Sequence, residues 1–156
     1  MIFTVDIVDE FGVADGVANL LETAVVTTLR QQKMQSALSL TLLLTDNETI
    51  QQLNRDYRGQ DKPTDVLSFP SGAGWPEIEA LGVYLGDIAV AVPVAENQAQ
   101  ISGHALNAEL QLLAVHGTLH LLGHDHLEAD DKADMWAAQT AVLQTLGLEN
   151  ITPTET

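Results

Sequence analysis

Four of the five histidines in this chain lie in one short segment, "HGTLHLLGHDH", which runs from His116 to His126. His116 and His120 are four residues apart, so on a helix they lie one turn apart on the same face. Gly123 stands where such a helix should end, and a glycine there lets the chain turn back sharply. The turn could return His126 to the same point, where three imidazole nitrogens could share one metal ion.

Three histidines predict an open zinc site. Structural zinc sites usually fill all four ligand positions, often with cysteine, whereas three histidines leave the fourth position for water. The chain has no cysteine, which excludes disulfides, thiolate zinc sites and a cysteine nucleophile. Asp125 could orient a ligand histidine or only stabilise the turn. We expect His124 to lie beside the site or at the surface, and His104 to be structural.

The same spacing is found in the metzincin proteases, which raises a zinc peptidase as an alternative. Those enzymes carry a glutamate general base directly after the first histidine, but this chain has Gly117 there. A zinc peptidase is therefore the least favoured hypothesis. A glycine inside a helix costs about 1 kcal/mol relative to alanine, so Gly117 predicts a close approach by another helix or by a substrate.

The basic residues also cluster. Three of the six, Arg55, Arg58 and Lys62, lie within eight positions of a chain whose net charge is −16. Such a charge opposes loose binding to nucleic acid, so a phosphate would bind best at this cluster. Capture of any nucleic acid would then need either a basic partner or a high salt concentration in the cell. The alternative is that the three charges only solvate a loop.

Hydrophobic patterns predict the elements that must position these residues. We expect one domain of mixed α+β class over residues 1–148, and a frayed tail over 149–156. A small mixed sheet of about four strands should pack with about five helices, with the metal site at the end of one helix. The predicted strands are 2–8, 37–45, 64–69 and 84–92; the predicted helices are 17–33, one from a Thr45–Glu48 capping box to about Tyr57, 94–102, 106–122 and 128–146.

The segment 69–82 is the one long irregular stretch. No apolar run is long enough for a membrane span, and the first residues lack the features of a secretion signal. We therefore expect a cytoplasmic protein that does not bind membranes.

Three segments, "LNRDYRGQDKPTDVLSFP", "YLGDI" and "HGTLHLLGHDH", resemble the signature segments of the YbeY family of bacterial metal-dependent single-strand endoribonucleases. The resemblance covers about residues 6–148 and departs at His124, where the family more often has tyrosine. It implies one Zn²⁺ ion bound by His116, His120 and His126, with Arg58 as the active-site arginine. It also implies ribosomal RNA maturation and ribosome quality control as the role, single-stranded ribosomal RNA as the substrate, and the ribosome or a ribosome-associated protein as the partner.

The residues suggest a compatible chemistry by themselves. Zinc lowers the pKa of a water ligand toward 7 and polarises a phosphoryl oxygen, so no neighbouring glutamate is needed. Arg58 could pair with the phosphate and offset the charge that grows in the transition state. Arg55 and Lys62 are weaker candidates for contacts with the RNA backbone. A ribosome-assembly module whose zinc only stabilises the fold is the second hypothesis, and the oligomeric state is left open.

Other polar and aromatic residues have weaker signals. Asp65 and Asp87 lie in apolar strand segments, where an unpaired carboxylate is costly. Each could brace Arg58 or a histidine, or only cap a neighbouring backbone segment. Tyr57 and Trp75 are candidates for base stacking, with core packing as the favoured alternative. No role is predicted for Ser68, because no histidine and acid are arranged beside it as a triad requires.

Overall fold

The computed structural model describes residues 3–35, 37–71, 83–124 and 128–151. Within these residues the fold is a four-stranded mixed sheet with five helices, which confirms the predicted α+β class. The elements in chain order are β1 (Phe3–Asp9), α1 (Val17–Gln31), β2 (Leu38–Thr45), α2 (Asn47–Arg58), β3 (Val66–Pro70), β4 (Val83–Ala91), α4 (Val92–Ser102), α5 (Leu106–Leu121) and α6 (Ala129–Thr145).

The sheet has the strand order β1-β2-β4-β3. The first three of these strands run parallel, and β3 pairs antiparallel with β4 at the edge. Side chains alternate between the two faces of a strand. In β2, Leu40 and Leu42 therefore face the main core, while Thr41 and Leu43 point to the opposite face.

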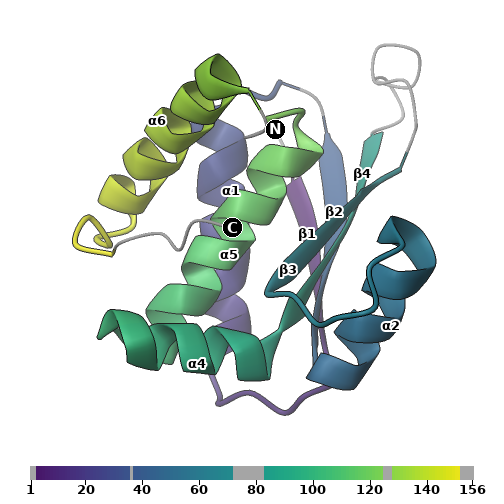
Figure 1. Ribbon diagram of the computed structural model, residues 1–156. Helices are drawn as coiled ribbons and strands as arrows, with labels where there is room; N and C mark the ends of the chain where they lie inside the picture. Colours follow the sequence, from purple (N-terminus) through teal and green to yellow (C-terminus); the bar gives the residue numbers. More distant parts are fainter. Residues whose placement is uncertain (1–2, 36, 72–82, 125–127, 152–156) are drawn as a thin grey trace.

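The helices divide between the two faces (Figure 1). Helices α1 and α5 cover one face, α6 packs outside them, and α4 lies below the start of α5. Helix α2 lies on the other face, where Ile50 packs with Leu67 of β3 and Ala89 of β4. Helix α5, which carries the first histidines, is buried on nearly all sides. A helix enclosed in this way is a rigid support for a site at its end.

The predicted capping box at the start of α2 is wrong by one residue. The N-cap is Asp46, whose carboxylate accepts a hydrogen bond from the backbone N–H of Thr49 at 2.8 Å. Thr45 is buried and still pairs with Ala91 in the sheet, so it belongs to the strand. Its pairing with β4 explains why the next residue becomes the cap.

Other boundaries differ from the predictions by one or two residues. Strand β3 begins at Val66 instead of residue 64. Helix α4 begins at Val92, before Pro93 rather than after it, because proline is tolerated in the first turn of a helix.

Parts of four predictions lie outside the described residues: the first residue of the strand 2–8, most of the irregular segment, at 72–82, the turn at 125–127 and the end of the tail, at 152–156. Within the described part of the tail, Ile151 packs against the main core. No described helix is long and apolar enough to cross a membrane.

Candidate functional site

Two of the three predicted zinc ligands lie together at the end of α5. The Nε2 atoms of His116 and His120 are 3.2 Å apart, and the ring centroids are 4.7 Å apart. Two nitrogens bound to a tetrahedral zinc ion at 2.0–2.1 Å would stand about 3.3 Å apart. The donor types and their separation therefore fit zinc. His126 and Asp125 lie outside the described residues.

The other ring nitrogen of His116 contacts α6. Its Nδ1 lies 2.9 Å from Oε1 of Gln139, a side chain that is only 1% exposed. The indole of Trp136 packs edge-on against the same imidazole, with centroids 5.8 Å apart. The sequence reasoning missed both residues because α6 reaches His116 only through packing against α5. Trp136 and Gln139 are three residues apart, which places them on one face of a helix, and this spacing could have indicated that both contact the same neighbour.

Arg58 is joined to the histidine helix through Ser68. Helix α2 ends at Gly59, whose φ of 70° lets the chain turn away directly after Arg58. The Arg58 guanidinium donates a hydrogen bond from Nη2 to the backbone carbonyl of Ser68 at 2.7 Å. The Ser68 hydroxyl in turn donates to the carbonyl of Gly117 at 3.2 Å. Ser68, which had no predicted role, therefore links the arginine to the residue that follows His116.

A cavity of about 610 Å³ opens beside Arg58 on the α2 side of the sheet. Tyr57 and Phe69 form part of its wall, with their rings edge to face and 5.3 Å between centroids. Tyr57 is 69% exposed, so the favoured prediction of core packing for this residue is wrong. Trp75, the other stacking candidate, lies outside the described residues.

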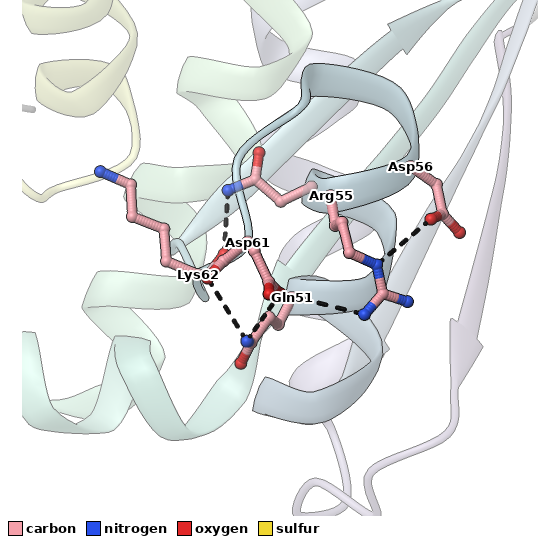
Figure 2. Close-up of polar contacts among 6 residues, drawn as sticks. Gln51, Arg55, Asp56, Asp61 and Lys62 are labelled. Carbon is pink, nitrogen blue, oxygen red and sulfur yellow. Dashed lines mark hydrogen bonds and ion pairs between the residues drawn. The ribbon is translucent and has the colours of Figure 1, made fainter.

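The two other clustered cations differ in their surroundings (Figure 2). Arg55 lies 3.4 Å from a carboxylate oxygen of Asp56 and 3.9 Å from one of Asp61, so its charge is offset locally. The backbone carbonyl of Lys62 accepts a hydrogen bond from Asn54 at 2.9 Å, while its side chain points away from this network. The contacts hold the loop after α2 against the helix.

The two aspartates that were predicted to lie in strands make different contacts; Asp65 directly precedes β3, and Asp87 lies in β4. The Asp65 carboxylate is buried and accepts from the backbone N–H of Val66 at 2.8 Å. Asp87 lines the cavity and accepts a hydrogen bond from the hydroxyl of Tyr84. Burial and this bond raise the pKa of Tyr84. Asp87 thus shares a cavity with Arg58, whereas the carboxylate of Asp65 is bound to the backbone of Val66 and, at 3.4 Å, to the side-chain amide of Gln98.

The remaining described histidines have partners away from the pair. Nε2 of His124 lies 2.8 Å from the side-chain oxygen of Gln32 at the end of α1. Nε2 of His104 lies 2.5 Å from a carboxylate oxygen of Glu109, which is fully buried. Burial raises the pKa of Glu109, although the contact with His104 acts in the opposite direction.

Gly117 packs against strand β4, and not against another helix or a substrate. A Cβ atom at this position would lie 2.8 Å from Cγ2 of Ile88 on β4. The predicted close approach is present, but its partner was wrong. The missing side chain lets α5 lie close to the sheet beside Ser68.

Comparisons with known proteins identify the family of this chain. A family model described as Endoribonuclease YbeY matches residues 7–147. The chain belongs to the YbeY endoribonuclease family. YbeY proteins of Bacillus thuringiensis and Bacillus cereus are each 38% identical to it over 154 residues, covering 95% of this chain and 99% of the relative. The solution structure of a Thermotoga maritima protein is similar over 92% of this chain and 89% of its own, with a TM-score of 0.61 and 27% identity.

Family membership confirms the resemblance seen in the sequence and the assignment to the hydrolytic nucleases. In this YbeY chain, the first signature segment supplies Arg58 and Ser68, and the last supplies His116 and His120. The fold brings these segments together at the edge strand β3.

Proposed function

We propose that this chain is a zinc-dependent endoribonuclease that cleaves single-stranded RNA during ribosomal RNA maturation. The observation that carries the proposal is the continuous connection from Arg58 through Ser68 to Gly117, next to the paired imidazoles. A guanidinium suited to phosphate and a donor pair suited to zinc are thereby fixed relative to each other. Membership of the YbeY family supports RNA as the polymer that is cut.

His116, His120 and His126 would hold the zinc ion. When bound, zinc supplies a Lewis acid for a phosphoryl oxygen and lowers the pKa of water toward 7. The protein contributes the orientation of the imidazoles from a buried helix, which loses little freedom when the metal binds. Asp125 is proposed to support a ligand histidine, a role for which carboxylates are well suited.

Arg58 would bind the scissile phosphate. Its planar guanidinium can donate two parallel hydrogen bonds to phosphate oxygens, and these strengthen as negative charge grows. The bond to the Ser68 carbonyl uses Nη2 and holds the guanidinium in place. Such preorganisation lowers the cost of ordering the side chain when RNA binds.

The cavity beside Arg58 would receive the RNA next to that phosphate. Tyr57 offers an exposed ring there, and every base has a face that can stack on it. Asp87 in the cavity could support the site by accepting hydrogen bonds, while Asp65 would support it indirectly, by holding the start of β3 and contacting Gln98 of α4. Arg55 and Lys62 would make weaker contacts with the RNA backbone beyond the cavity.

The cellular setting is proposed from the family resemblance and the charge. A cytoplasmic enzyme of net charge −16 would gain from a basic partner that delivers its substrate, and the ribosome or a ribosome-associated protein would serve. Cleavage of RNA at the ribosome would also account for a role in ribosome quality control. We propose that one domain, residues 1–148, carries the whole activity.

Substitution of Arg58 tests the proposal most sharply. Arg58→Ala should bind zinc like the wild type but lower kcat/KM on single-stranded RNA at least 100-fold, the scale for loss of a transition-state donor. Arg58→Lys should recover only part of the loss, because ammonium cannot make the two parallel bonds. Arg30→Ala, an exposed arginine on the opposite side of the sheet, is the matched control.

Full cleavage by Arg58→Ala would contradict the proposed role of this residue. Zinc binding without cleavage of RNA by the wild type, alone or with ribosomes, would instead favour the ribosome-assembly module with a stabilising zinc site. A zinc peptidase finds no support in the described residues, because Gly117 leaves the position of its general base without a side chain.

A further inference from the structure

We propose that Gln139 is a positioning residue of the metal site, because its amide oxygen holds His116 in the tautomer whose Nε2 can bind zinc. The inference rests on the zinc site of the proposed function. It concerns a residue of α6 that belongs to none of the signature segments. It predicts that the affinity for zinc depends on a helix that supplies no ligand.

The tautomer follows from the hydrogen-bond geometry. A neutral imidazole carries one proton, so one ring nitrogen donates and the other accepts. Nδ1 of His116 lies 2.9 Å from Oε1 of Gln139, and a carbonyl oxygen can only accept. Nδ1 must then carry the proton, which leaves the lone pair on Nε2. That lone pair is on the nitrogen that lies 3.2 Å from Nε2 of His120.

The surroundings keep Gln139 in this contact. The side chain is 1% exposed, so a lost hydrogen bond could not be replaced freely by solvent. The edge-on packing of Trp136 restricts rotation of the same imidazole. Lys132, one turn earlier on α6, lies 5.6 Å above the Trp136 ring. One face of α6 therefore sets both the protonation site and the orientation of His116.

The amide of Gln139 fixes the tautomer of His116 less strictly than a carboxylate would. Turned by half a rotation, an amide presents its nitrogen and would favour a proton on Nε2, the tautomer that cannot bind zinc. A carboxylate can only accept, and its charge makes the ligand imidazole more basic. Gln139 should therefore give weaker zinc binding than a glutamate at the same position.

The effect of Gln139 on zinc binding can be measured without any RNA, by competition for zinc with a coloured chelator. Gln139→Leu replaces the amide with an apolar group of similar size, which removes the acceptor, and should weaken zinc binding about 10- to 100-fold. Gln139→Glu should bind zinc at least as tightly as the wild type. Gln144→Leu, an exposed glutamine on the same helix, should leave the affinity unchanged.

A second measurement needs no substitution. In ¹⁵N spectra of the wild-type histidine side chains, His116 should carry its proton on Nδ1, both before and after zinc is added. A proton on Nε2 before zinc is added would overturn the inference, as would unchanged affinity in a folded Gln139→Leu protein. Neither result would contradict the proposed endoribonuclease activity. Failure of the wild type to bind zinc would overturn both proposals, so the two failures are distinguishable.

Discussion

The side chains that serve the proposed site are oriented by contacts from distant parts of the chain. Ser68 is 49 residues from Gly117, and Gln139 is 23 residues from His116, yet each pair is hydrogen-bonded. The histidine spacing and the basic cluster were visible in the sequence because their chemistry is local. Ser68 and Gln139 were not, because common polar residues acquire a role only from what the fold brings to them.

The exposed ring of Tyr57 is expected to contribute to RNA binding. Tyr57→Ala should raise KM for single-stranded RNA about tenfold, because loss of base stacking costs on the order of 1–3 kcal/mol. Its stability should change little, since the ring is 69% exposed. Tyr57→Phe keeps the stacking face and should have a near-normal KM. An unchanged KM in the alanine variant, measured by steady-state kinetics, would exclude this ring from substrate binding.

Packing between helices and strands positions the site, and Gly117 of α5 lies close against Ile88 of β4. Its replacement by alanine would gain about 1 kcal/mol of helix propensity. The new methyl group would clash with Ile88, which is fully buried, and such overpacking costs about 1–3 kcal/mol. We expect Gly117→Ala to lower the free energy of unfolding by about 1 kcal/mol.

A double-mutant cycle separates that clash from other effects. Ile88→Ala alone should cost about 2–5 kcal/mol, because it leaves a cavity in the core. When the two substitutions are combined, the loss of unfolding free energy should be smaller than the sum of the two single losses. The shorter side chain at position 88 leaves room for the new methyl group at position 117, which partly fills the cavity. Strictly additive losses in denaturant unfolding would mean that Gly117 is not kept free of a side chain by Ile88.

The contact between His104 and Glu109 ties the start of α5 to the end of α4, and it predicts a pH dependence. Burial holds the pKa of Glu109 above its ordinary value, and the charge of Asp65 acts in the same direction. The protonated carboxyl therefore contributes stability below the unfolded-state pKa of about 4.3. That contribution is lost as the pH rises through the higher pKa of the folded protein.

Glu109→Gln should remove this loss, because an amide does not ionise. The variant should unfold at a higher denaturant concentration than the wild type at about pH 8, and the difference should shrink toward about pH 4. A difference that stays constant between these two values would mean that ionisation of Glu109 does not limit stability.

Element types were easier to predict than element ends. Apolar runs and helical periodicity identified the four strands and five helices that the structure describes. The start of α2 was misplaced because Thr45 and Asp46 are both good caps, and only the pairing of Thr45 with Ala91 decides between them. Sheet pairing is a long-range property, so the local pattern did not contain it.

The molecule as a whole is strongly acidic, and its proposed substrate is a polyanion. Basic nucleases bind RNA less tightly as salt increases, because binding releases counterions. Here the repulsion from a net charge of −16 opposes the attraction of a few cations, and salt screens both. We therefore expect RNA affinity that is nearly independent of salt or rises with it. A steep fall in affinity between about 50 and 200 mM salt would show that the local cations dominate.

The two explanations of the charge differ in this titration. If the protein works at high salt in the cell, affinity for free RNA should increase as salt is added. If a basic partner delivers the RNA, added salt should produce no such increase, and adding ribosomes should strengthen binding instead.

Cleavage of a labelled single-stranded RNA by metal-stripped protein, before and after zinc is restored, shows whether the metal is required for phosphodiester cleavage. His120→Ala is run alongside, because it removes one imidazole of the pair on α5. We predict that the stripped wild type is inactive, that about one equivalent of zinc restores cutting, and that the variant neither binds zinc normally nor cleaves. Equal cleavage by the stripped protein, the zinc-restored protein and His120→Ala would show that neither zinc nor the imidazole pair takes part in cleavage.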